Sequence, residues 1–392
     1  MKSAWGVPLH ERLRQIATPL IPTGSRIVVA VSGGADSIAL LHLLVASRLT
    51  APEHLLVAHF DHNLRPDSSL DAAFTREQAK KLGVAAVDRV WTAPPSSGNL
   101  QEQAREARLV FLLETARQFQ AAFIATGHHL DDQAETFLDR LLRGSGVCGL
   151  AAMRASRPLA DGIRLIRPLL FARRQELLSW LTAHQLSWRE DPSNQSPDYR
   201  RNRVRHWALP ALEKSANQDP APAIALATQH LRRAHEALEW SLQHLWPQLD
   251  ARQNDTFQTL SLDWQALRPL PDELLRRVLV RCHTQLNGDD HSPGERATEQ
   301  FIHLIGTPRR RWSMILRGMR IQRIHNRVFF APCSGAAKHQ AATPVEKEPW
   351  ETVEFSTWCP YDERRRFTHP DAPRQIMKHH SQEHRPIQEK SA

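Results

Sequence analysis

The residues that most constrain the fold are Arg26–Ser37, which read RIVVAVSGGADS. A run of β-branched residues ends in a short Gly-Gly turn, and an apolar helical pattern begins at Ile38. This order predicts a buried strand that turns tightly into the N-terminus of a helix. Backbone N–H groups at such a turn point outward with partial positive charge, so the turn can hold a phosphate.

The residue types in the turn fit an anion. Gly33 and Gly34 let the backbone approach a phosphate closely, and Ser32 and Ser37 add hydroxyl donors. Asp36 adds a carboxylate that can hold Mg²⁺ against phosphate oxygens. The lysine of the Walker loop is missing, and the pattern is not G-x-G-x-x-G. An ordinary turn with a helix N-cap also explains these residues, and that alternative stays open here.

Further along the chain, predicted strands alternate with predicted helices. This alternation is typical of βαβ units, in which a parallel sheet carries helices on both faces. Strands are expected at 26–31, 55–60, 84–90 and 121–126, with helices at 38–49, 71–82, 99–119 and 131–143. SGGxDS after an apolar strand also resembles the signature of PP-loop ATP pyrophosphatases. That resemblance implies an α/β fold of the adenine nucleotide alpha hydrolase type, related to the Rossmann fold, and cleavage of ATP into AMP and pyrophosphate.

At 392 residues the chain exceeds one typical core, so at least two domains are expected. We predict a parallel-sheet catalytic domain over 1–215, a mainly helical accessory domain over 222–332 and a disordered tail over 333–392.

Four scattered cysteines without a C-x-x-C pair favour a reducing cytosol over a structural zinc site. Without a signal peptide or an apolar run of spanning length, a cytoplasmic protein with no membrane contact is expected.

Two polar clusters follow predicted strand ends, where parallel sheets bind their ligands. In HFDHNLRPDSS, the side chains of His59, His62 and Arg65 can surround an anion or a base, although some of these histidines can equally satisfy loop backbone groups. GHHLDDQAET places carboxylates three and four residues apart on one helix face, where a cation or an amine would relieve their repulsion. Helix-dipole compensation explains the two aspartates but explains Glu135 less well.

SGGADS, HxDHxLR, NLQEQAREARL and GHHLDDQAETFLDRLLRGSGVCGL occur in this order, followed by EDPSNQSPDYRRNRVR. Together they resemble the tRNA(Ile)-lysidine synthetase family over roughly residues 20–215. The resemblance implies conversion of the wobble cytidine of an isoleucine tRNA with a CAU anticodon to lysidine. ATP would adenylate the C2 oxygen of cytosine with loss of pyrophosphate, and the ε-amine of free L-lysine would then displace AMP. The oligomeric state stays open.

The resemblance also implies roles for individual residues. ATP would bind Ser32, Gly33, Gly34, Ala35, Asp36, Ser37, His59, His62, Arg65, Gly127 and His128. Lysine would bind Arg105, Asp131, Asp132 and Glu135. Mg²⁺ would be held by Asp36 and Asp132, and the catalytic residues would be Asp36, Asp132, Glu135 and Arg108. A solvated helix face, balanced by neighbouring glutamates, equally explains Arg105 and Arg108.

Two arginine-rich stretches without acids suit contacts with RNA phosphates. The lysine and arginine total of 51 exceeds the acidic total of 42, which gives a formal net charge of +9 and favours a polyanionic partner. The first stretch holds Arg200, Arg201, Arg203 and Arg205; the second begins with Arg309, Arg310 and Arg311 and continues through Arg317, Arg320, Arg323 and Arg327. Trp312 within the second is expected to stack on a base, whereas Trp240, Trp246 and Trp264 are expected in the core. A charged solvated face explains the second stretch as well.

Two positions depart from the family pattern. Asn63 replaces a common glycine, but asparagine tolerates positive φ, and Leu109 replaces a common aromatic residue. The extra C-terminal domain of long family members has no counterpart in the pattern after Pro332.

Rival functions are tRNA thiolation, which typically needs paired cysteines, and amide formation on a small molecule, which fits a basic chain less well. A catalytically inert RNA-binding protein that senses nucleotides is the alternative outside the enzymes.

Overall fold

The computed structural model of the chain describes residues 7–63, 68–92, 100–190, 200–254, 258–288, 293–316 and 318–333. The described residues up to Pro332 belong to one compact unit. The domain boundaries at 215 and 222 remain predictions, and the predicted tail lies outside the described residues apart from Cys333. Within the described ranges, no helix is long and apolar enough to cross a membrane.

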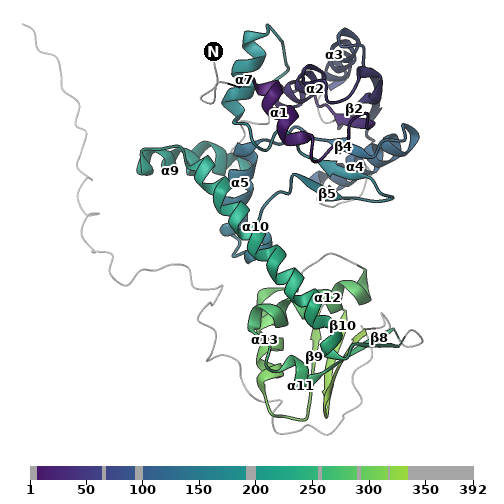
Figure 1. Cartoon of the computed structure of the whole chain (residues 1–392), viewed down its shortest axis with the longest axis vertical. Helices are drawn as coiled ribbons and strands as arrows, with labels where there is room; N and C mark the ends of the chain where they lie inside the picture. The colour runs from purple at the N-terminus through teal and green to yellow at the C-terminus, as the bar shows by residue number, and fades with distance from the viewer. Residues whose placement is uncertain are drawn as a thin grey trace, which may run out of the picture. The chain divides into compact units, whose positions relative to one another are not determined.

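A six-stranded sheet with the order β3-β2-β1-β4-β6-β5 forms the first part of the chain (Figure 1). All pairings are parallel except that of β5 with β6. This confirms the predicted parallel-sheet α/β fold. The strands are β1 (Ile27–Ala30), β2 (Leu55–Asp61), β3 (Ala85–Val90), β4 (Phe123–Ala125), β5 (Ser156–Pro158) and β6 (Arg164–Ile166).

Helices cover both faces of this sheet because its central strands are apolar on both sides. On one face, Ile27, Val29 and Val31 pack in a cluster with α1, α2 and α7, whereas Val28 packs on the other face with residues of α4. The helices are α1 (Leu9–Ala17), α2 (Ala35–Ser47), α3 (Ser68–Lys81), α4 (Leu100–Gln118), α5 (Leu130–Leu141), α6 (Val147–Leu150) and α7 (Arg174–Ala183). Short 3-10 turns lie at Pro52–His54 and Trp246–Leu249, the latter labelled η4.

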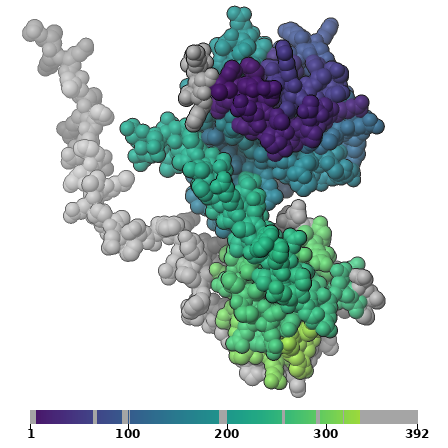
Figure 2. Space-filling model, viewed as in Figure 1, coloured from purple at the N-terminus to yellow at the C-terminus, as the bar shows by residue number. Residues whose placement is uncertain are grey.

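The N-terminal helix closes one side of this layer. Figure 1 shows α1 beside α7, and in Figure 2 the purple surface of α1 adjoins the teal surface of α7. An ion pair of 2.7 Å between Arg12 and Glu176 joins the two helices. Leu9 and Leu13 are buried beneath it, so α1 is part of the core.

After the sheet, the chain is helical and then forms a second sheet. The elements are α8 (Arg200–Arg203), a π-helical turn (Val204–Ala208), α9 (Leu209–Ala216), α10 (Pro220–Leu245), α11 (Trp264–Leu267), α12 (Asp272–Asn287) and α13 (Glu295–Gly306). The five strands are β7 (Arg252–Asn254), β8 (Thr259–Asp263), β9 (Arg311–Leu316), β10 (Met319–Ile324) and β11 (Arg327–Pro332), in the antiparallel order β7-β8-β11-β10-β9.

This second sheet changes the expected picture of the accessory region. Helices were expected over 222–332 and are present there, but the strands β7 and β8 lie between α10 and α11. Those two strands are three and five residues long, too short for their period of two to stand out from a helical pattern. The second arginine-rich stretch, which begins at Arg309, continues into the antiparallel strands β9, β10 and β11.

The tryptophans of this region divide between core and surface. Trp264 is buried and Trp246 packs against the same cluster, as predicted. The prediction for Trp240 was wrong, because its side chain is 62% exposed and contacts His244 in the next helical turn. The prediction for Trp312 was also wrong: β9 turns Trp312 into the core, where it is 5% exposed and cannot stack on a base.

Candidate functional site

The SGGADS turn has the predicted strand–turn–helix geometry. β1 ends at Ala30, and α2 begins at Ala35. Gly33 has a φ of +90°, which a residue with a side chain rarely adopts. The Ser37 hydroxyl donates to the Gly34 carbonyl at 2.8 Å and accepts from the Ser32 N–H at 3.2 Å. Ser37 therefore fixes the turn in which Ser32 and α2 face the same space.

A second loop, which follows β4, touches the SGGADS turn directly. β1 lies between β2 and β4, and the strand order reverses between β1 and β4, where open α/β sheets bind ligands. A Cβ atom added to Gly127 would lie 2.8 Å from the carbonyl oxygen of Asp36. Such an approach is closer than side-chain carbons tolerate, so only glycine fits where the two loops meet.

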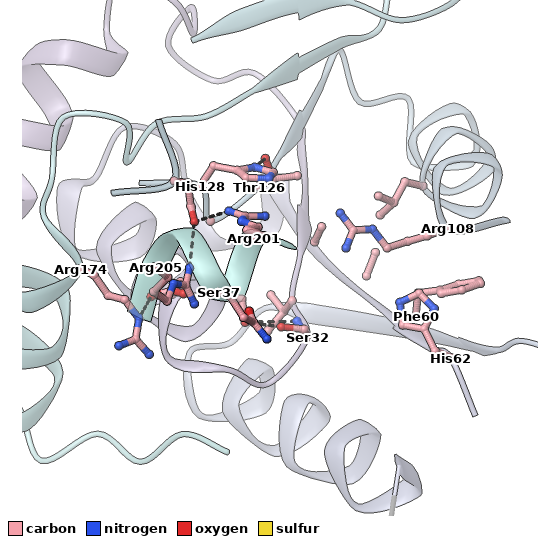
Figure 3. Close-up of a pocket in the computed structure, with 18 residues that line it drawn as sticks. Ser32, Ser37, Phe60, His62, Arg108, Thr126, His128, Arg174, Arg201 and Arg205 are labelled. Carbon is pink, nitrogen blue, oxygen red and sulfur yellow. Dashed lines mark hydrogen bonds and ion pairs between the residues drawn. The ribbon is translucent and has the colours of Figure 1, made fainter. Parts of the chain in front are cut away.

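The two loops enclose a cavity of about 380 Å³. Figure 3 shows Phe60, His62 and Arg108 grouped on one side of it, and Arg174 and Arg205 on the other, with Ser32 and Ser37 between. The complete lining is Ala30, Val31, Ser32, Asp36, Ser37, Ala58, Phe60, His62, Arg108, Leu112, Thr126, Gly127, His128, Asp132, Arg174, Arg201, Asn202 and Arg205. One wall therefore suits an aromatic base, and the other suits charged groups.

The carboxylates at the charged wall differ in their surroundings. Asp36 Oδ2 lies 3.6 Å from His129 Nε2, and Asp36 Oδ1 lies 3.7 Å from Arg174 Nε and accepts no hydrogen bond from the described residues. Burial would raise the pKa of Asp36, but His129 and Arg174 outweigh it and lower that pKa. Asp132 is 5% exposed and accepts from the N–H of His129 at 2.9 Å. Asp36 is therefore held as a carboxylate, and Asp132 lies beside it at the cavity.

Two consecutive histidines have opposite ionisation. Burial, with the charges of nearby arginines, lowers the pKa of His128 to about 4, and its Nδ1 lies 2.8 Å from the Thr126 hydroxyl. Burial would also lower the pKa of His129, but contacts with Asp131 and Asp36 and the charge of Asp132 raise it to about 9. The neutral His128 lines the cavity, whereas the charged His129 lies beneath the acids.

Two arginines meet the buried acids. Arg205 Nε lies 2.6 Å and Arg201 Nε 2.7 Å from the carboxylate of Glu135, which is 1% exposed. Arg201 also pairs with Asp132, and Figure 3 shows both guanidinium groups in the charged wall. The π-helical turn that begins at Val204 carries Arg205, and such turns occur often at functional sites.

The comparisons with known proteins agree with this site. The PP-loop domain family matches residues 7–212. The chain is 40% identical to a protein named tRNA(Ile)-lysidine synthase from Ruegeria pomeroyi, over 71% of this chain and 65% of the relative. Proteins of the same name are 33% identical in Symbiobacterium thermophilum, over 83% of this chain and 69% of the relative, and 39% identical in Gloeobacter violaceus, over 70% and 81%. The chain belongs to the tRNA(Ile)-lysidine synthase family.

The U34-tRNA thiolase NcsA from Methanococcus maripaludis is similar in structure, with a TM-score of 0.48 and 18% identity over 57% of this chain and 76% of its own. The chain spans about two thirds of the length of the first synthase relatives, 65% and 69%. The match to the PP-loop domain family ends at residue 212, within the shared part of the chains.

Several residues expected from the resemblance to the synthase family line the cavity. They are Ser32, Asp36, Ser37, His62, Arg108, Gly127, His128 and Asp132. Asn63 has a φ of +51°, which confirms the expected positive φ at that position. Gly33, Gly34 and Ala35 form the turn itself without lining the cavity. Arg65 lies outside the described residues.

Other expected residues lie elsewhere. His59 is buried with its Nδ1 2.9 Å from the Val31 carbonyl, so it ties β2 to β1 instead of lining the cavity. Arg105 is exposed and does not line it, because Arg108 occupies the inward position on α4. Asp131 accepts from the N–H of Arg174 at 2.7 Å; burial opposes ionisation, but this bond and those from His129 and Arg173 lower its pKa.

The expected RNA-binding arginines also divide. Arg200 pairs with Asp139 at 3.1 Å, and Arg201 and Arg205 bind the acids of the cavity, whereas Arg203 is exposed. In the second stretch, Arg309, Arg310, Arg311 and Arg320 are exposed, and Arg317 lies outside the described residues. Arg323 is buried over the Trp264 ring, and Arg327 binds Asp250, so both are structural.

Eight lining residues were missed, of which four are apolar and small or aliphatic (Ala30, Val31, Ala58 and Leu112) and four are aromatic, polar or charged (Phe60, Thr126, Arg174 and Asn202). Arg174 begins α7, where two consecutive arginines precede an apolar helical pattern. A basic residue at a helix start, close to a predicted phosphate site, was the available signal. Asn202 lies inside the RRNRVR motif and could have been taken with its arginines.

Proposed function

We propose that this chain is a tRNA(Ile)-lysidine synthase, which ligates L-lysine to C2 of the wobble cytidine of a tRNA(Ile) with a CAU anticodon and releases AMP and pyrophosphate. Family membership and the relatives' names support this proposal. The single observation that carries it is the contact between the SGGADS turn and the loop at Gly127, because it brings a phosphate turn and carboxylates to one cavity.

ATP fits the cavity with its base at the wall of Phe60 and His62. The phosphates would then lie against Ser32, Ser37 and the N-terminus of α2, where N–H groups carry partial positive charge. Arg174 is positioned to bind the departing pyrophosphate, because its Nε has no hydrogen-bond acceptor among the described residues. Arg108, on the base side, would bind an oxygen of the nucleotide.

The residues present fit Mg²⁺. Asp36 Oδ1 is buried without a hydrogen-bond partner among the described residues, and Asp132 lines the same cavity. Mg²⁺ is commonly held by one or two carboxylates together with substrate phosphates. When bound, it would neutralise charge that develops on the phosphate oxygens.

For lysine, Asp132 is the carboxylate that we assign to the ε-ammonium, because it alone of Asp131, Asp132 and Glu135 lines the cavity. Glu135 would act by holding Arg201 and Arg205 in place. An amine must lose its proton before it attacks, and its pKa in water is about 10.4. A carboxylate contact orients the ammonium and can accept that proton.

The test is to incubate the protein with ATP, [¹⁴C]lysine and purified tRNA, and to analyse the nucleosides by mass spectrometry. A synthase yields lysidine and one pyrophosphate per lysine incorporated. Release of pyrophosphate without lysidine would point to one of the other PP-loop chemistries. No described cysteine lines the cavity, which disfavours thiolation.

A further inference from the structure

Three arginines from three separate elements hold one loop. Arg140 at the end of α5, Arg167 after β6 and Arg232 on α10 donate to main-chain carbonyls of residues 149–154. The donor–acceptor distances are 2.7 Å from Arg140, 2.8 Å from Arg167 and 2.7 Å from Arg232. The loop joins α6 to β5, and α10 packs against both α5 and α6.

Carbonyl oxygens satisfy N–H donors but leave the net charge of a guanidinium uncompensated. Within the described residues, none of these three arginines has a carboxylate oxygen within 4.0 Å. Arg167 is only 9% exposed, and its Nε has no hydrogen-bond partner among the described residues. Burial of an unpaired cation is costly. The charges of Asp139 and Glu236 act on Arg140 and Arg232, but among the described residues neither acid forms an ion pair with the three arginines, so positive charge remains in excess at the loop.

Further arginines extend this cluster towards the cavity. Arg154 lies in the held loop and is exposed, as is Arg105 on α4. Burial, then the charges of neighbouring arginines including Arg105, lower the pKa of Arg167 to about 10. Burial and the charge of Arg105 also lower the pKa of Arg108, which lines the cavity. The charges are therefore close enough to repel one another, and they adjoin the wall of the cavity expected to bind the base.

We propose that Arg105, Arg140, Arg154, Arg167 and Arg232, the loop arginines, form a binding site for successive phosphates of an RNA backbone beside the cavity. The inference rests on the proposed function and names a surface for the tRNA in addition to the two arginine-rich stretches. An RNA strand supplies several phosphates at fixed spacing, which matches a charge spread over three elements and a loop.

This site would be an RNA-binding surface that the sequence pattern did not predict. Acids pair with Arg200, Arg201 and Arg205, whereas Arg140, Arg167 and Arg232 donate to neutral carbonyls. Arg105 and Arg154 are the exposed members, so they would contact phosphates directly. Arg140, Arg167 and Arg232 would hold the loop in place and add to the positive electrostatic potential that attracts phosphates.

The test uses the full-length double variant Arg105→Gln/Arg154→Gln, which removes two exposed charges and leaves the three loop-holding arginines in place. We expect the Kd for tRNA to rise about tenfold at moderate salt, and the slope of log Kd against log salt to fall by about 1 per arginine. The affinity for ATP should not change. The melting temperature should stay equal or rise, because repulsion between like charges is relieved.

The matched control is Arg76→Gln/Arg117→Gln, which makes the same change in net charge. Arg76 pairs with Asp88 and Arg117 with Asp161, and their side chains are 51% and 50% exposed. If both double variants alter tRNA binding equally, the effect comes from net charge alone, and the inference is overturned. If the wild-type protein makes no lysidine at all, the proposed function fails instead, so the two failures are distinguishable.

Discussion

At the scale of single residues, the surroundings of a side chain determine its ionisation more than its residue type does. His128 and His129 are neighbours, yet one has its pKa lowered to about 4 and the other has it raised to about 9. Burial acts on both in the same direction. The difference arises because the ring of His129 lies within 3.6 Å of carboxylates of Asp36, Asp131 and Asp132.

Asp36→Ala should abolish ATP-dependent lysine incorporation without unfolding the protein. Its side chain is 34% exposed and lines the cavity, so its removal costs little packing. Its loss removes the carboxylate assigned to Mg²⁺. The measurement is lysidine formation together with a circular dichroism melt. Wild-type turnover in a folded variant would contradict the metal assignment.

Gly127→Ala should reduce activity strongly and lower the free energy of unfolding by about 1–3 kcal/mol. The new methyl group would meet the main chain of Asp36, which cannot move without shifting the phosphate turn. Gly306→Ala is the control, because an added Cβ there meets no atom within 4 Å and φ is not positive. Thermal melts and pyrophosphate release measure the two effects. Equal behaviour of both variants would contradict the close approach.

Glu135→Gln should raise the KM for lysine more than that for ATP, and should destabilise the protein by about 3 kcal/mol or more. The change leaves Arg201 and Arg205 without one of their carboxylates at a buried position, where loss of a charge partner is expensive. The matched control is Glu114→Gln. Glu114 forms an exposed ion pair with Arg89, and its loss should lower the free energy of unfolding by at most about 1 kcal/mol. An unchanged KM for lysine would mean that Glu135 does not support the lysine site by holding Arg201 and Arg205.

At the scale of elements, sequence predicted what is local and continuous. β1, the SGGADS turn, α2 and the acidic start of α5 follow from apolar runs, glycines and helix spacing within about twelve residues. The pairing of Arg201 and Arg205 with acids about 70 positions earlier could not be predicted, because the partners are distant in sequence and Arg205 lies in a π-helical turn that departs from regular helix spacing. The same limit applied to Trp312, whose inward orientation depends on which face of β9 is covered.

The element β9 and the turn before it give a further prediction. Arg309→Ala, Arg310→Ala and Arg311→Ala together should weaken tRNA binding and flatten its salt dependence without changing the affinity for ATP, because these exposed arginines contact no cavity residue. Filter binding at several salt concentrations measures the slope. An unchanged slope would place the RNA elsewhere, for instance on the loop arginines.

At the scale of the whole molecule, the helix α10 contacts helices that lie next to each of the two sheets. Thr228 on α10 accepts from Gln133 of α5 at 3.3 Å, and His235 on the same helix lies 2.9 Å from Arg277 of α12. Gln133 also bonds both main-chain groups of Met153, which places it between the helix and the loop. The helix α10 is therefore integrated with its neighbours by buried polar contacts.

A chain that ends at Pro332 should keep most of its catalytic activity and its melting temperature. The residues up to Pro332 form one compact unit, and the sequence after it lacks hydrophobic periodicity. Lysidine formation with purified tRNA, compared between the full-length and shortened chains, is the measurement. A large loss would mean that the last 60 residues contribute to folding or to RNA binding.

The contact between Gly127 and Asp36 has a consequence for how such a cavity can diversify. The spacing between the phosphate turn and the loop that leads to the acids is set by main-chain atoms in contact, so exchanges of side chains around the cavity leave it unchanged. Descendants of this scaffold could therefore acquire new acceptor substrates by varying the opposite wall, including Phe60 and His62, while they retain the geometry for activation by ATP. The acceptor substrate could therefore change while the activation by ATP stays the same.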